Sequence, residues 1–118
     1  MATLSAVNGE LVLHLSRREK LGAFHGDIRV PLASVEEVRV SSSPFGEVRG
    51  TRAPGTGCPR VIALGTWRKR GGKDFVALYR GKPGVVVVLR DEAYRRLLVS
   101  ADDPEAVLAA LDLTAAAR

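Results

Sequence analysis

The residues of this sequence that are best suited to chemistry are a group of cations beside a tryptophan. Trp67 is followed by the stretch RKRGGK, which places four positive charges within six residues. Guanidinium and ammonium groups bind phosphate and carboxylate, and an indole ring offers a flat face for stacking. The candidate residues for binding an anion or a partner are Arg68, Lys69, Arg70, Lys73, Trp67, Arg52 and Arg60. The simpler interpretation is that the cations form the solvated tip of a hairpin.

Positive charge is concentrated in the middle of the chain. The 118 residues carry a net charge of +5, yet residues 49–82 hold nine Lys or Arg against one acid, Asp74. Such asymmetry indicates either a solvated rim that keeps the protein soluble or an anionic partner, which would be a phospholipid surface, an acidic protein or a nucleic acid. Nucleic acid is the least favoured of the three, because aromatic residues are only 5% of the chain and base-stacking proteins present several. The sequence therefore favours a protein partner or an anionic membrane surface.

Residues for catalysis or metal binding are scarce. His14 and His25 are the only histidines, and they fall on different predicted elements. The single cysteine, Cys58, cannot form an internal disulfide or a cysteine-based metal site. The glycines within residues 55–57 precede a predicted strand, so they lack the helix that a phosphate-binding loop requires. We expect no catalytic residue, no metal and no cofactor, and hence a protein that is not an enzyme.

The chain has the length and composition of one globular domain, residues 1–118. Its longest apolar run, residues 85–89, is far too short to cross a bilayer. The first residues have neither a basic leader nor an apolar stretch of signal-peptide length. We therefore expect no transmembrane segment and a cytoplasmic location.

Hydrophobic periodicity predicts a chain made mainly of β-strands. The segment ELVLHLS places Leu11, Leu13 and Leu15 on one face, which is typical of a half-buried strand. Seven strands are predicted, at residues 10–16, 28–32, 35–40, 61–67, 74–79, 85–89 and 96–100. From residue 61 onward, short turns between the strands indicate a regular antiparallel meander.

Two long segments are predicted to be irregular. Residues 17–27 are polar and interrupted by glycine, and residues 41–60 contain three prolines and four glycines. A loop as long as the second is uncommon inside a compact domain and is often functional. Phe45 and Val48 favour a second interpretation, in which residues 41–60 form a flap that covers an open end of the barrel.

The end of the chain carries the signals of one helix, at about residues 103–113. Asp103 can cap the first turn through its carboxylate, Pro104 fits the first helical position, and Glu105 complements the helix dipole. Apolar residues in the following turns form one stripe. This helix is therefore predicted to pack over the sheet structure.

The order of these elements resembles that of pleckstrin-homology (PH) domains. The segment IRVPLASVEEVRV is similar to a strand pair common in bacterial members of that superfamily, and LLVSADDPEAVLAAL is similar to their final strand and helix. The resemblance omits residues 41–60. It implies a small antiparallel barrel or sandwich of about seven strands, closed by one C-terminal helix and used as a scaffold for binding. Many PH domains read phosphoinositides through basic residues in their first loop, whereas the densest basic cluster here comes later.

Three functions remain open on the sequence alone, and nucleic-acid binding is the least favoured of them. The first is a non-enzymatic binding domain of PH-like fold that engages a protein partner or an anionic surface through the basic hairpin. The alternative is a small β-barrel that binds a flavin-type cofactor as a dimer, with a pocket lined by Arg49, Arg52 and the backbone of residues 55–57. Exposed sheet edges would allow a homodimer in either case.

Overall fold

The computed structural model describes residues 2–23, 25–58 and 61–116, with only the backbone described over residues 51–54, 56–58 and 112–116. Its elements are β1 (Thr3–Val7), β2 (Glu10–His14), α1 (Arg17–Ala23), β3 (Ile28–Pro31), the 3-10 turn η1 (Leu32–Ser34), β4 (Val35–Ser41), the 3-10 turn η2 (Pro44–Glu47), β5 (Thr51–Cys58), β6 (Ile62–Lys69), β7 (Gly72–Tyr79), β8 (Gly84–Leu89), β9 (Arg96–Ser100) and α2 (Pro104–Ala116). The prediction of a mainly β chain that ends in a helix is confirmed.

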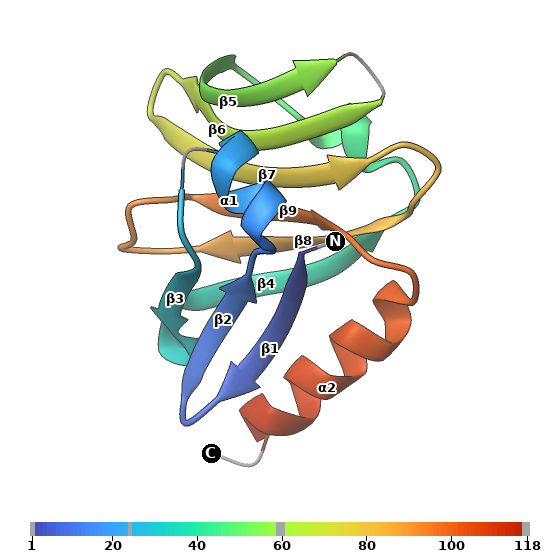
Figure 1. Ribbon diagram of the computed structural model, residues 1–118. Helices are drawn as coiled ribbons and strands as arrows, with labels where there is room; N and C mark the ends of the chain where they lie inside the picture. Colours follow the sequence, from blue (N-terminus) through green and yellow to red (C-terminus); the bar gives the residue numbers. More distant parts are fainter. Residues whose placement is uncertain (1, 24, 59–60, 117–118) are drawn as a thin grey trace.

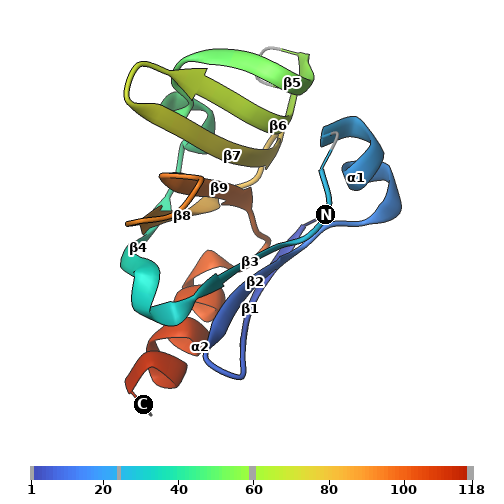
Figure 2. The same ribbon diagram turned by 90° about the vertical axis from the view of Figure 1, so that its left-hand side faces the viewer.

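The strands form two sheets (Figure 1). One is an antiparallel sheet with the order β1-β2-β3, and the other has the order β4-β8-β9-β7-β6-β5. Helix α2 lies between them and contacts β1, β4 and β8 (Figure 2). In the part of the chain that the structure describes, no strand pairing joins the two sheets, so the closed PH-like barrel stays a prediction.

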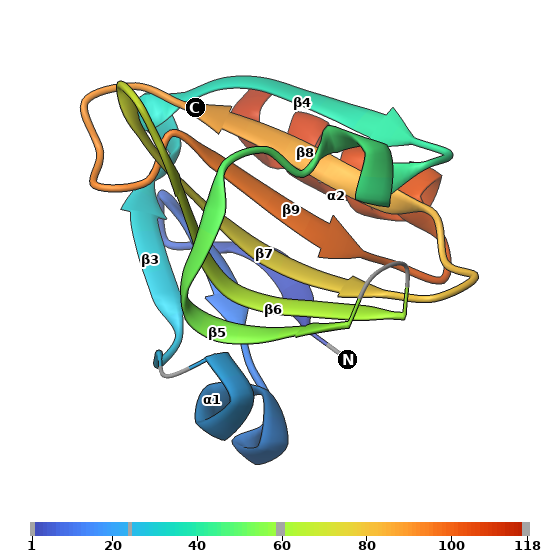
Figure 3. The same cartoon turned by 90° about the horizontal axis from the view of Figure 1, so that it is seen from above.

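The predicted antiparallel meander is wrong at its last strand. Strand β9 lies between β7 and β8, and it runs parallel to β7 (Figure 3). All five residues of β9 are buried, so this strand is most stable in the middle of the sheet, with a hydrogen-bonding neighbour on each side. Periodicity shows which face of a strand is apolar and does not show which strand lies beside it.

Each face of the six-stranded sheet carries an apolar cluster. The larger cluster lies on the inner face, toward the three-stranded sheet and α2, and includes Phe75, Val87 and Leu97. The smaller one lies on the outer face and includes Trp67 and Val86. The covering segment, residues 44–49, lies over this outer cluster through Phe45 and Val48. The expectation of a flap is therefore confirmed in its packing, although it covers a sheet face instead of a barrel end.

The structure has two elements near the N-terminus where none was predicted. Strand β1 pairs with β2 through a tight turn at Asn8 and Gly9, both with positive φ, which is the turn chemistry of a two-residue hairpin. Helix α1 takes up residues 17–23 of the segment that was predicted to be a loop. It begins with a capping box, because Ser16 N donates to Glu19 Oε1 at 2.9 Å and Glu19 N donates to Ser16 Oγ at 3.2 Å.

The prediction of an irregular loop over residues 41–60 is also wrong. Within this segment η2 forms the first turn, and β5 pairs with β6 along the edge of the sheet. The pairing register shifts between Arg52 and Gly55, which marks an irregularity of the bulge type. Proline and glycine are tolerated at bulges and on edge strands, where they interrupt few ladder hydrogen bonds. The glycine and proline content of this segment therefore led to the prediction of a loop where the structure has a strand.

Candidate functional site

The basic hairpin is the turn between β6 and β7, at the left of Figure 1. Because β6 extends to Lys69 and β7 begins at Gly72, the turn itself is shorter than the RKRGGK loop expected from the sequence. Arg68, Lys69 and Arg70 are exposed, and Arg68 stands opposite Lys73 in the strand register. The structure therefore brings together the four cations that the sequence singled out.

A fifth cation, Arg95, joins the hairpin from the start of β9. Its Nη1 donates to Gly71 O at 2.6 Å, and its backbone N donates to Lys73 O at 2.8 Å. Its aliphatic stem lies against Gly72, where an added Cβ would come within 2.2 Å of Arg95 Cδ. The parallel pairing of β7 and β9 places Arg95 here, so no local sequence signal could have found it. We call Arg68, Lys69, Arg70, Lys73 and Arg95 the basic end.

The lysine of the basic end is held over an aromatic ring. Lys73 Nζ lies 4.7 Å from the centroid of the Tyr94 ring, within the range of a cation–π interaction. Tyr94 is itself fixed, because its hydroxyl lies 2.8 Å from Thr66 Oγ1 and its ring packs edge-on against Phe75 and His25. This support gives Lys73 a defined position on a rigid base.

Most of the basic end lacks a carboxylate partner. Among the described residues, no ion pair joins Lys69, Arg70, Lys73 or Arg95 to an acidic side chain. Asp74, which follows Lys73, is 2% exposed and faces other arginines. Of the two acids shortly before Arg95, Glu92 accepts a hydrogen bond from Ser34 Oγ, and no ion pair joins Asp91 to these cations among the described residues. The positive charge of these four side chains is therefore available to an external anion.

Trp67 does not offer the stacking surface that the sequence suggested. The residue is only 8% exposed and belongs to the outer apolar cluster, beneath the covering segment. Trp67 pairs with Asp74 across the hairpin, so its side chain leaves the sheet on the same outer face. The covering segment buries that face, and the covering segment comes from a part of the chain that looked irregular.

The two remaining candidates lie in less fully described parts of the chain. Arg52 is in β5, and its backbone stands opposite Trp67, which places it in register beside the basic hairpin. Its side chain is outside the described atoms. Arg60 lies outside the described residues altogether.

A partly buried ion network holds the covering segment beside the basic end. Asp74 accepts hydrogen bonds from Arg49 Nε at 2.9 Å and from Arg96 Nη2 at 2.8 Å, both at Oδ2. Arg96 Nη2 also donates to the backbone oxygen of Glu47 at 2.6 Å. The Glu47 carboxylate accepts from Arg39 Nη2 and Nη1 at 2.9 and 3.0 Å. Asp74 and Glu47 are thus each bound by two arginines, and Arg39 also lies 4.0 Å from the carboxylate of Glu37.

The same contacts set the ionisation of Glu47. Its two hydrogen bonds from Arg39 hold the pKa of its carboxyl below the ordinary value of 4.5, and the charges of Arg39 and Arg96 act in the same direction against its partial burial. Glu47 therefore stays charged to a lower pH than a free carboxylate, which keeps the covering segment fixed.

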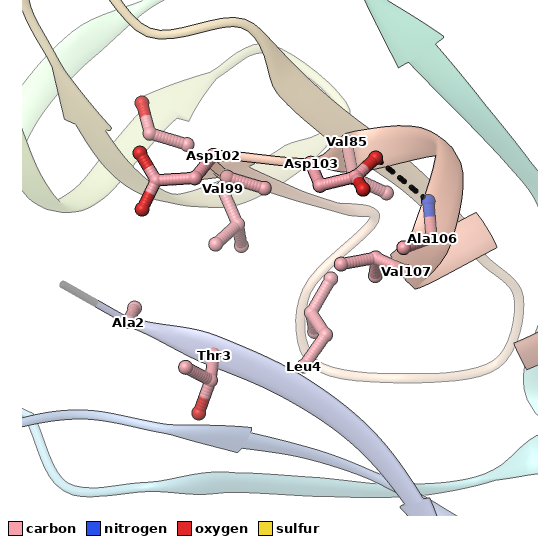
Figure 4. A pocket seen from close by; sticks show the side chains of 11 residues that line it. Ala2, Thr3, Leu4, Val85, Val99, Asp102, Asp103, Ala106 and Val107 are labelled. Carbon is pink, nitrogen blue, oxygen red and sulfur yellow. Dashed lines mark hydrogen bonds between the residues drawn. The ribbon is translucent and has the colours of Figure 1, made fainter. Parts of the chain in front are cut away.

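A pocket lies at the opposite end of β9, where β1, β8, β9 and the start of α2 meet (Figure 4). Its volume is about 350 Å³, and side chains of Leu4, Val99 and Val107 face it while Asp102 and Asp103 stand at its rim. It is remote from the basic end, because β9 runs from Arg96 at one end to Ser100 at the other.

The residues that the cofactor hypothesis placed around a pocket have structural roles. Arg49 is bound to Asp74, and the backbone of residues 55–57 pairs with β6 as a strand.

Within the described ranges, no three His, Cys, Asp or Glu side chains are grouped so as to hold a metal ion. None of the described helices is long and apolar enough to cross a membrane. Comparison with models of protein families, with curated proteins and with solved structures finds no match.

Proposed function

We propose that this protein is a non-enzymatic binding domain of PH-like type that engages an anionic surface through its basic end. The observation that carries the proposal is the convergence of five cations, four from the β6–β7 hairpin and one from the residue before β9, on one end of the sheet. Four of them have no carboxylate partner among the described side chains. Such a group attracts anions and raises their local concentration.

The rigidity of the basic end supports this proposal. Arg95 is bonded to the hairpin backbone, and Lys73 is held over Tyr94. Cations fixed in this way lose little side-chain entropy when an anion binds, so less of the binding free energy is lost to ordering. Solvated tips that serve solubility alone require no such fixation.

The burial of Trp67 restricts the mode of binding. With the ring 8% exposed, the hairpin contributes charge and no aromatic insertion. Binding is then mainly electrostatic, and we expect it to weaken as salt shortens the Debye length. Lys and Arg near an anionic membrane contribute about 1 kcal/mol each, so a basic end of this size suffices for reversible adsorption.

The test is co-sedimentation of the protein with phosphatidylcholine vesicles, with and without phosphatidylserine, at low and moderate salt. A parallel arm replaces the vesicles with polyglutamate, to distinguish a lipid surface from an acidic protein. We expect binding to an anionic probe that falls as salt rises. The double variant Lys69→Glu and Arg70→Glu should weaken binding at least about thirtyfold, from about 1 kcal/mol for each lost cation.

A matched control reverses two exposed cations elsewhere. Arg18 lies on α1, and Arg80 follows the far end of β7, so Arg18→Glu with Arg80→Glu gives the same change in net charge away from the basic end. The control should bind nearly as well as the wild type. No binding of the wild type to either probe at low salt, or equal losses in both double variants, would overturn the proposal.

A further inference from the structure

The pocket at the start of α2 is formed by three parts of the chain that are distant in sequence. Residues from β1, from the ends of β8 and β9, and from the first turns of α2 enclose about 350 Å³ (Figure 4). Pockets that bind small molecules begin at about 300 Å³. The space is therefore large enough for one compact ligand and too small for a folded segment of a partner.

The walls of this pocket are apolar and fixed by the core. Val85 and Val99 are 1% and 2% exposed, and Ala2 is 3% exposed, so its inner wall belongs to the main apolar cluster. Leu4 and Val107 pack against that cluster from the two sides. A ligand would therefore enter a preformed apolar site, and no side chain of the core would have to move.

The rim of the pocket carries negative charge in a chain whose net charge is +5. Asp103 Oδ1 accepts the hydrogen bond from Ala106 N at 3.1 Å that caps α2, and its second oxygen is available for another donor. Asp102 already binds a primary ammonium, since Lys82 Nζ is its hydrogen-bonded partner. This pair shows that a carboxylate at the rim of the pocket accepts an alkylammonium group.

Apolar walls beside carboxylates select for one chemical class of ligand. An alkyl or aryl stem gains free energy by leaving water, whereas the carboxylates attract a cation and repel an anion. We propose that this pocket binds a small amphipathic amine, with its apolar stem between Leu4, Val99 and Val107 and its ammonium at the second oxygen of Asp103, next to Asp102. The site is separate from the basic end and does not depend on the function proposed for it.

The test is an NMR titration of the ¹⁵N-labelled full chain with three probes that share a hexyl stem: hexylammonium, hexanol and heptanoate. We expect saturable shifts of the amides of Leu4, Val99 and Val107, with the affinity falling in that order. Asp102→Asn with Asp103→Asn should weaken hexylammonium and leave hexanol unchanged, by about fivefold for each carboxylate at low salt, the upper range for an exposed ion pair. Asparagine at 103 preserves the helix cap.

A second pair of variants tests the place of binding. Ala106 lines the pocket, whereas Ala109 lies one turn further along α2 and does not. Ala106→Leu should fill the pocket and abolish the shifts, while Ala109→Leu, the same change on the same helix, should bind like the wild type. Equal affinity for the three probes, no saturable shift with hexylammonium, or binding that survives Ala106→Leu would overturn the inference.

Discussion

Asp74 and Arg96 stand opposite each other in the parallel pair of β7 and β9, and both are buried. Nε and Nη2 of Arg96 donate to the same Asp74 Oδ2, at 3.1 and 2.8 Å. Arg49, at the end of the covering segment, donates to that oxygen as well, at 2.9 Å. One carboxylate therefore joins the middle of the sheet to the segment that covers its outer face.

Removing that charge should destabilise the fold strongly. Asp74→Asn preserves the shape of the side chain but leaves Arg96, which is 8% exposed, without its main counter-charge. We expect the free energy of unfolding to fall by about 3–5 kcal/mol, the cost of breaking a buried ion pair from one side. Urea unfolding followed by circular dichroism measures it. The control is Glu37→Gln, because the Glu37 side chain is 57% exposed and its contact with Arg39 is 4.0 Å long. A loss in Asp74→Asn no larger than in the control would show that the pair contributes little.

Stability should fall in acid, in part through Glu47. Arg39 lowers the pKa of this carboxyl in the folded state, so the unfolded chain binds its proton more readily. The resulting stabilisation is complete above the ordinary value of 4.5 and is lost as the pH falls through the lower folded pKa. Glu47→Gln should therefore be less stable than the wild type at neutral pH, and its stability should decrease less on acidification. Urea midpoints measured across this range give both quantities, and parallel curves for the two proteins would contradict the assignment.

Gly55 should not tolerate a side chain. Its φ is +154°, and an added Cβ would lie 2.1 Å from the backbone oxygen of Leu64, which cannot move without breaking the β5–β6 pairing. We expect Gly55→Ala to cost more than about 1 kcal/mol of unfolding free energy, because alanine is strained at such a position. Gly26→Ala is the control, since nothing lies within 4 Å of the added Cβ. If both variants unfold at the same urea concentration, the close approach of β5 to β6 is wrong.

The fluorescence of Trp67 should change when the protein unfolds and stay unchanged when it binds a membrane. It is the only tryptophan of the chain and is buried under the covering segment. Its fluorescence should therefore be blue-shifted in the native protein and shift to the red in urea. Addition of anionic vesicles that bind the protein should leave it unchanged, and lipid-borne quenchers should have no effect. Quenching by those lipids would place the ring at the bilayer and restore its role as an anchor.

Much of the fold could be predicted because it depends on local patterns. Strand β9 coincides with the predicted strand at residues 96–100, and α2 begins at Pro104 with the predicted cap from Asp103. Strand β5 escaped prediction because glycine and proline at an edge resemble a loop. Helix α1 also escaped prediction, because it is short and its main local signal is the capping box at Ser16 and Glu19.

The candidate site was only half predictable. The four cations of the hairpin are neighbours in sequence, and proximity in the chain guaranteed their proximity in space. Arg95 and Arg49 reach the same region through strand pairing and through the covering segment, which no local pattern encodes. The burial of Trp67 has the same origin, because Phe45 and Val48 cover it from a segment that looked irregular.

The central position of β9 also bears on how the chain is made. A ribosome completes β7 and β8 before it reaches residues 96–100, yet those two strands are each paired with β9 and not with each other. Until β9 leaves the exit tunnel, the nascent chain carries two strands with open edges, and one of them reads GVVVVL. Such edges are prone to aggregate, so this protein should need a chaperone most between the emergence of β8 and the pairing of β9.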